Sequence, residues 1–395
     1  MTALVESRTN REGRNLYIDM LRGISIVLVM LLHYSLSYRL QSSPLQDWVP
    51  VSTLRAIFYN GNYGVDIFFV VSGFLITSNM LGRYGSLAGI DVVHFYKLRF
   101  FRLYPLVMIA LAAITALGLA GLTNFSNVAH HTHLGVGFFV IADLSVLTFW
   151  HNVLMEAVGY FNYAMNIYWS LSVEEVFYLL YPLVLLVSRR GWQLIVLACI
   201  FVAIAPVYRQ IYQDNELYFM YGNLACVDML TYGCVAAIVA KHVKLIGAWR
   251  RLLALLACLA MGWIYLRGIH GNEALGATWL GMAAASFLIV VSGLPAGGFA
   301  RRLGGPLAWL GAHSYELYLF HIIVLGIIVE RVPRGTMAVA HKLPMLAVFF
   351  VLSAMLAWGM ARFCGDPLNR WLRRRFARRI VGTPDATQAV GACAS

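Results

Sequence analysis

Apolar runs long enough to cross a lipid bilayer recur along this chain, and they constrain its fold more than any other feature. A membrane-spanning helix needs about 20 mostly apolar residues. With 60% hydrophobic and only 12% charged residues, the chain has too little polar surface for a water-soluble domain. The sequence therefore predicts an all-α integral membrane protein, a polytopic bundle of about 10 transmembrane helices. The expected spans are residues 17–38, 60–81, 101–120, 164–187, 192–208, 218–240, 252–268, 276–294, 307–329 and 344–363.

A further apolar segment, 136–154, is interrupted by Asp143 and His151, and the distribution of cations indicates whether it crosses. Lys and Arg concentrate in cytoplasmic loops. With ten spans and a cytoplasmic N-terminus, most of the cations fall inside. An eleventh span would instead place Arg189, Arg190 and the basic C-terminal tail outside. We therefore expect both termini to be cytoplasmic and segment 136–154 to lie on the outer surface or to be re-entrant.

The net charge of +12 belongs to these inner loops and tails rather than to a globular basic domain, which argues against a nucleic-acid partner. Residues 1–16 are expected to form a cytoplasmic tail and 17–363 the transmembrane domain. Residues 364–380 form a basic juxtamembrane segment, whose alternating apolar residues and arginines suit anionic lipid heads. A simple stop-transfer anchor explains the same pattern. The small, polar stretch 381–395 is expected to be disordered.

The first span carries an arginine and a histidine, which are costly inside a bilayer and therefore candidates for function. Arg22 lies near the cytoplasmic end, and His33 follows eleven residues later. That separation is close to three helical turns and a rise of roughly 16 Å, so both side chains share a face and His33 lies near mid-membrane. A packed histidine that hydrogen-bonds a neighbouring helix is the alternative.

A pair of carboxylates lies in the run 166–175, which is expected to enter the membrane from the outer side. Glu174 and Glu175 are expected roughly 15 Å deep, where either one can meet His33. A carboxylate beside a histidine stabilises its imidazolium form, as a general base requires. The two side chains point about 100° apart, so only one is expected to face the histidine. A structural hydrogen bond between helices is the alternative.

Two arginines at the cytoplasmic entrance of the third span, Arg99 and Arg102, share a face at a spacing of three residues. Guanidinium groups bind phosphate oxygens in a bidentate manner, so the pair is suited to a nucleotide-bearing cofactor, although ordinary positive-inside anchoring explains it equally well. In the second span, Asp66 is a candidate for orienting a partner.

The ninth span places Ser314, Tyr318 and His321 near one stripe, and His321 is a second candidate acid or base. The histidines at 130, 131 and 133 lie in an outer loop, but their spacing fits no zinc pattern, so no metal is expected.

At these residues the chain resembles the acyltransferase 3 family of membrane-bound O-acyltransferases that modify glycans. The resemblance covers about residues 15–370. It rests on five motifs in order: Arg22 and His33 in the first helix, the Gly-Val-Asp segment of 64–74 that contains Asp66 and Ser72, Arg99 and Arg102, the run 169–182 that contains Trp169 and Glu174, and the run 314–321 that contains Tyr318 and His321.

The resemblance implies that His33 accepts the acyl group or acts as the general base, and that a carboxylate at 174 or 175 orients it. It also implies that Arg22, Arg99 and Arg102 hold an acyl-CoA donor. We expect Asp66, Ser72, Trp169, Tyr318 and His321 to bind or orient substrate.

The predicted function is transfer of an acyl group, most commonly acetyl from acetyl-CoA, to a hydroxyl of an extracytoplasmic or lipid-linked glycan such as a surface polysaccharide, exopolysaccharide or O-antigen. The predicted location is a bacterial inner membrane. Many relatives carry an additional extracytoplasmic hydrolase-like domain of the SGNH type, for which the segment after 363 is too short. We therefore expect transfer to finish within the bundle or through a separate extracytoplasmic protein. A proton-coupled secondary transporter is the alternative, although no inverted repeat is evident.

Overall fold

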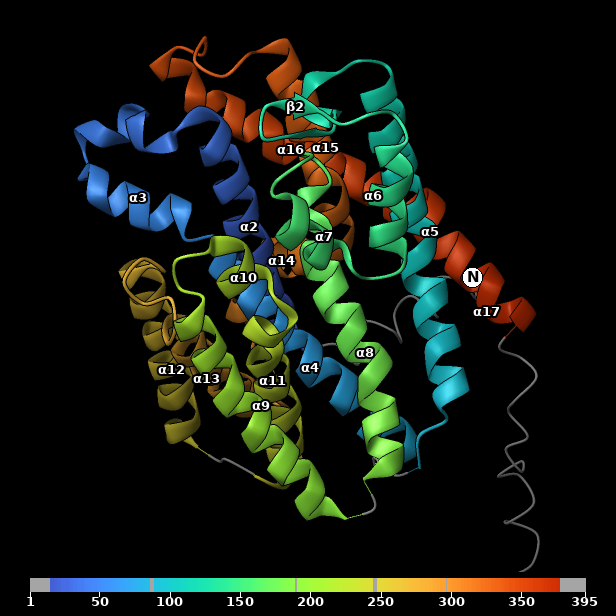
Figure 1. The fold of residues 1–395 in the computed structure, drawn as a ribbon. Helices are drawn as coiled ribbons and strands as arrows, with labels where there is room; N and C mark the ends of the chain where they lie inside the picture. The colour runs from blue at the N-terminus through green and yellow to red at the C-terminus, as the bar shows by residue number, and fades with distance from the viewer. Residues whose placement is uncertain (1–14, 86–88, 189, 244–246, 296, 377–395) are drawn as a thin grey trace, which may run out of the picture.

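In the computed structural model, the structure describes residues 15–85, 89–188, 190–243, 247–295 and 297–376 (Figure 1). The predicted disordered stretch 381–395 and most of the predicted tail 1–16 lie outside these ranges. The α-helices are α2 (Leu16–Tyr38), α3 (Val51–Tyr59), α4 (Asn62–Tyr84), α5 (Val92–Leu119), α6 (Phe138–Leu147), α7 (His151–Val158), α8 (Trp169–Val187), α9 (Gly191–Ile211), α10 (Glu216–Tyr221), α11 (Asn223–His242), α12 (Ala248–Arg267), α13 (Gly276–Val291), α14 (Gly298–Ala312), α15 (Ser314–Arg331), α16 (Lys342–Met360) and α17 (Asp366–Phe376). A short hairpin, β1 (Val128–Ala129) with β2 (Thr132–His133), is the only sheet in the described residues.

The expected all-α membrane bundle is confirmed. Eight helices among the described residues are long and apolar enough to cross a bilayer, and the bent pair α14 and α15 adds a ninth candidate. The axes of α14 and α15 differ by 71° at His313, so the predicted span 307–329 is a broken helix rather than a straight one. The remaining predicted span corresponds to α13, an apolar helix of 16 residues that is shorter than a typical span.

Segment 136–154 does not form one continuous helix. α6 ends at Leu147, and α7 begins at His151 after Phe149 adopts a positive φ of 64°. Figure 1 shows these helices in the upper half of the molecule with α3 and the β hairpin, and it shows α10 below α7; together we call these elements the upper layer. We call this end of the bundle the upper end, and the opposite end, where α4 and α8 finish and α9 begins, the basic end. Arg83, Arg190 and Lys241 belong to the basic end, which the positive-inside rule predicts to be the cytoplasmic one.

Glycines bring the central helices into close contact. A Cβ atom at Gly73 of α4 would overlap the carbonyl oxygen of Leu230 in α11, and one at Gly23 of α2 would overlap that of Leu307 in α14. Small residues allow helix backbones to approach in a membrane, where van der Waals packing drives association. The polar residues of α2 and α4 are therefore held firmly at the centre of the bundle.

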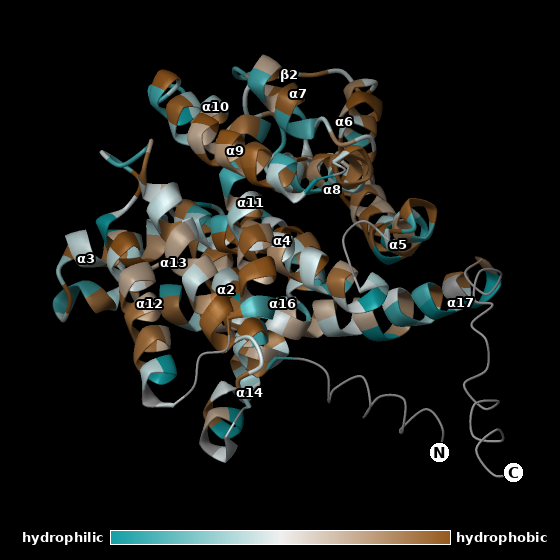
Figure 2. Ribbon diagram, turned by 90° about the horizontal axis from the view of Figure 1, so that it is seen from below, coloured by the Kyte–Doolittle hydropathy of each residue, from teal (hydrophilic) through white to brown (hydrophobic). Residues whose placement is uncertain are grey.

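The helix α17 extends sideways from the bundle, and Figure 2 shows it in mostly hydrophilic colours. It contains most of the predicted basic juxtamembrane segment, including Arg370, Trp371 and Arg375. The guanidinium of Arg375 lies 5.5 Å from the centroid of the Trp371 ring.

Candidate active site

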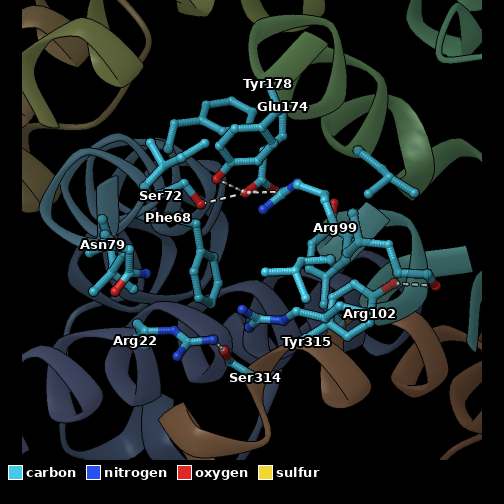
Figure 3. A pocket seen from close by; sticks show the side chains of 18 of the residues that line it. Arg22, Phe68, Ser72, Asn79, Arg99, Arg102, Glu174, Tyr178, Ser314 and Tyr315 are labelled. Atoms are coloured by element: carbon cyan, nitrogen blue, oxygen red, sulfur yellow. Dashed lines mark hydrogen bonds and ion pairs between the residues drawn. The ribbon is translucent and has the colours of Figure 1, made fainter. Parts of the chain in front are cut away.

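The polar residues inside the bundle surround two cavities that lie end to end. The inner cavity, of about 330 Å³, is reached from the basic end and is lined by α2, α4, α5, α8 and α15 (Figure 3). The outer cavity, of about 930 Å³, is reached from the upper end and is lined by the last turns of α2, the first turn of α4 and the upper layer. The two cavities bring together residues that are far apart in the sequence.

Four arginines line the inner cavity. They are Arg22, Arg83, Arg99 and Arg102, so the three arginines that the sequence predicted as donor ligands do lie around one space. Arg22 donates from Nη2 to the Ser314 hydroxyl at 2.8 Å, an interaction that joins α2 to α15 (Figure 3). Arg102 is exposed, and its guanidinium makes no hydrogen bond or ion pair within the described part of the chain.

Arg99 is bound to both predicted carboxylates. Its Nε donates to Glu175 at 3.0 Å, and its Nη2 donates to Glu175 at 2.7 Å and to Glu174 at 3.3 Å. The guanidinium also stacks 3.2 Å from the centroid of the Tyr178 ring. These contacts occupy Nε and Nη2 and leave the N–H groups of Nη1 for a ligand.

The expectation that Glu174 or Glu175 faces His33 is therefore corrected. Glu174 also accepts hydrogen bonds from Ser72 at 2.5 Å and from Tyr178 at 2.6 Å, so the carboxylates form a network on the inner cavity (Figure 3). The reason is depth along α8. Trp169 lines the outer cavity, whereas Ser170 already lines the inner one, and Glu174 lies a further turn toward the basic end.

The partner of His33 is His321. Nδ1 of His33 lies 3.1 Å from Nε2 of His321, while Nδ1 of His321 lies 2.8 and 2.9 Å from the carbonyl oxygens of Leu317 and Tyr318. Carbonyl oxygens only accept hydrogen bonds, so Nδ1 of His321 carries a proton. Nε2 of a neutral His321 is then an acceptor, which requires a proton on Nδ1 of His33. The Nε2 atom of His33 is left with a lone pair, as a base or nucleophile needs.

His33 lines the outer cavity, whereas His321 is completely buried. The same cavity is lined by Trp169 and by polar side chains of the upper layer. Two of these, Tyr160 and Tyr163, lie in the loop after α7. Burial raises the pKa of both phenols, so each stays neutral and able to donate a hydrogen bond at ordinary pH.

Asp66 lies apart from the arginines of the inner cavity. It borders a small pocket of about 30 Å³ that Trp169 and Arg209 also line. Arg209 forms a buried ion pair with Asp228 at 2.7 Å, and its Nη2 also donates to the Thr278 hydroxyl at 2.6 Å. This group ties α9, α11 and α13 together beside α4.

Sequence reasoning missed Arg83, Asn79 and the Arg209–Asp228 pair. Arg83 was not among the predicted site residues, although it lines the inner cavity with Asn79. The signal for Asp228 was available, because a carboxylate in the predicted span 218–240 is as costly as the charges in the first span. No cluster of three or more potential metal ligands occurs in the described ranges.

The fold and the two cavities define a polytopic membrane protein with a polar site inside its helical bundle. The chain matches the acyltransferase domain family known as acyltransferase 3 over residues 15–341, and it belongs to that family.

Its relatives are O-acetyltransferases by name. The chain is 25% identical over 355 residues to the O-acetyltransferase OatA of Staphylococcus aureus (strain NCTC 8325), covering 82% of this chain and 55% of that protein. It is 26% identical over 353 residues to the putative peptidoglycan O-acetyltransferase YrhL of Bacillus subtilis, covering 81% and 52%. It is 24% identical over 343 residues to the peptidoglycan O-acetyltransferase OatA of Listeria monocytogenes, covering 80% and 51%. The chain thus spans about half the length of these relatives. No solved structure matches it.

Proposed function

We propose that the protein transfers an acyl group, most commonly acetyl from cytoplasmic acetyl-CoA, to a hydroxyl of an extracytoplasmic or lipid-linked glycan. The observation that carries this proposal is that an arginine-lined cavity at the basic end meets a larger cavity at the other end, beside the paired histidines. Family membership and relatives named as peptidoglycan O-acetyltransferases support the same reaction class.

The inner cavity is suited to the donor. Its volume of about 330 Å³ is at the small end for a ligand pocket, so the pantetheine arm enters while the nucleotide stays at the mouth. Arg22, Arg83, Arg102 and the free Nη1 of Arg99 supply the cations for phosphate groups. The Arg99 carboxylate network positions this arginine rather than the catalytic histidine.

The outer cavity is suited to a saccharide. Aromatic faces at Tyr160, Tyr163 and Trp169 pack against sugar rings, and the amides of Asn62 and Asn166 hydrogen-bond hydroxyl groups. A volume of about 930 Å³ leaves room for more than one sugar ring. Peptidoglycan, an exopolysaccharide and an O-antigen are the acceptor classes to test.

The lone pair on Nε2 of His33 allows two routes. In the first, it takes the proton from the acceptor hydroxyl while the oxygen attacks the thioester carbonyl, the C–S bond breaks, and the proton passes to the departing thiolate. In the second, Nε2 attacks the carbonyl itself and the C–S bond breaks, which gives an acyl-histidine and the CoA thiolate; the acceptor oxygen then attacks the acyl carbon, the C–N bond breaks, and the hydroxyl proton passes to the thiolate. In both routes Nδ1–H of His33 remains donated to His321, which fixes the ring orientation.

Inverted membrane vesicles containing the protein test the proposal. With acetyl-CoA labelled in the acetyl group and glycan acceptor inside the vesicles, the label should appear as an ester on the glycan or on a lipid-linked saccharide. Solute flux without any acylation would favour the transporter alternative. Mass spectrometry of surface glycans from a deletion strain would then identify the acceptor. The acyl group reaches this acceptor either in the outer cavity or through a separate extracytoplasmic protein.

The basic juxtamembrane segment adds a proposed lipid contact. Arg370 and Arg375 flank Trp371 on α17, a combination that suits the anionic inner surface of a membrane. A flotation assay with vesicles that contain or lack anionic lipid would test it on a peptide of residues 366–380.

A further inference from the structure

The wall between the two cavities is formed by very few side chains. Of the described lining residues, Val65 on α4 and Tyr318 on α15 belong to both cavities. On α8, adjacent residues face opposite sides, with Trp169 on the outer cavity and Ser170 on the inner one. The wall is therefore about one side chain thick, and His33 lies directly on its outer side.

Tyr318 closes the wall through hydrogen bonds to the first turn of α8 and to the 3-10 turn (Asn166–Tyr168) that precedes it. Its hydroxyl lies 2.6 Å from the Ile167 carbonyl oxygen and 2.5 Å from the Ser170 hydroxyl. The carbonyl only accepts, so Tyr318 donates to Ile167 and accepts from Ser170. These are side-chain interactions, and a change of rotamer at Tyr318 breaks them without disturbing either helix.

Val65 has no such freedom. It is 5% exposed, and its neighbour Gly64 packs so tightly on α2 that a Cβ there would come within 2.6 Å of the Ser25 carbonyl oxygen. A β-branched side chain has few rotamers, and this backbone has no room to retreat. Val65 consequently keeps its position when Tyr318 moves, and it sets the width of the opening between the two side chains.

We infer that Val65 and Tyr318 form the passage through which the acyl group reaches His33, and that Val65 limits the acyl chain to acetyl or a similarly short group. This inference rests on the proposed function, because it needs a thioester donor in the inner cavity. Tyr318 acts as the movable side and Val65 as the fixed side. Each additional methylene must then fit against Val65, and a tight apolar pocket discriminates by roughly 10-fold or more per methylene.

The test compares acetyl-CoA with butyryl-CoA as donors in the vesicle assay. Val65→Ala should raise the ratio of butyryl to acetyl transfer by about tenfold, and Val65→Ile should lower acetyl transfer. Tyr318→Phe, which keeps the ring but loses both hydrogen bonds, should raise the ratio by a smaller factor. Val70→Ala is the matched control, because Val70 is buried on the same helix and lines neither cavity, so the ratio should stay at the wild-type value.

Two failures are distinguishable. If wild-type protein transfers acetyl but the ratio is the same in Val65→Ala, Val65→Ile and Tyr318→Phe, the passage is elsewhere and this inference is overturned. If wild-type protein transfers no acyl group from either donor, the proposed function itself is wrong, and the inference is overturned with it.

Discussion

His33 on α2 and His321 on α15 face each other with 3.1 Å between Nδ1 and Nε2, and two backbone carbonyl oxygens fix the proton on the far nitrogen of His321. The backbone carbonyl oxygens of α15 fix the tautomer of His321, and the hydrogen bond between the two rings then fixes the tautomer of His33. A histidine takes over the orienting role that the sequence had assigned to a glutamate. His33 lines the outer cavity, whereas its partner His321 is fully buried behind it.

Replacing His33 by Ala should reduce acyl transfer by about 100-fold or more, because the proposed base or nucleophile is removed. Measurement of labelled ester formed per mole of protein in membranes checks this. His341→Ala is the control, since His341 is exposed at the start of α16. Undiminished transfer by the His33 variant would exclude it from the chemistry.

Replacing His321 should separate positioning from binding. His321→Phe removes the acceptor for Nδ1–H of His33 and should lower kcat by at least about tenfold with the KM for acetyl-CoA unchanged. His321→Gln offers an amide oxygen to the same proton and should recover part of that loss. Equal kcat values for the two variants would contradict a role through the His33 tautomer, because a purely structural role does not distinguish them by acceptor chemistry.

Arg83 and Arg102 should contribute to donor affinity rather than to stability. Each lines the inner cavity, so Ala at either position should raise the KM for acetyl-CoA by about 10-fold, the value of a charge-assisted hydrogen bond to phosphate. The thermal midpoint in detergent should not change. Arg301→Ala, an exposed arginine on α14, supplies the control. A KM that stays constant in both variants would place the phosphates elsewhere.

Arg99 should behave differently from its neighbour Arg102. Glu175 is 4% exposed, so Arg99→Ala leaves a buried carboxylate without its cation and should destabilise the protein by about 3–5 kcal/mol. Arg99→Lys should recover little, because an ammonium does not reproduce the bonds from Nε and Nη2 or the stacking on Tyr178. Thermal unfolding in detergent measures both variants, and a wild-type midpoint for Arg99→Ala would show that the network is not structural.

The sequence predicted much of this architecture, since span length and cation distribution depend on the bilayer alone. It also placed Arg22 near the cytoplasmic end of the first span and His33 further along the same helix. It did not predict which residue His33 meets, because the depth of Glu174 was estimated from the end of its span, without knowing that the outer cavity penetrates as far as Trp169. The 71° bend at His313 was likewise missed, because a hydropathy profile does not encode direction.

The pairing of Arg209 with Asp228 shows the same limit and supplies a last prediction. The two side chains are 2% and 0% exposed, and they lie on different helices, so their contact depends on how α9 and α11 pack. Asp228→Asn leaves Arg209 with a buried charge and should cost about 3–5 kcal/mol of folding free energy. The double variant Asp228→Asn with Arg209→Gln removes both charges and should recover part of that loss. Thermal unfolding of Asp228→Asn, of Arg209→Gln and of the double variant measures the coupling. Additive losses would show that the pair is not held as an ion pair, whereas recovery in the double variant would establish that this charge pair holds α9 against α11 beside Asp66.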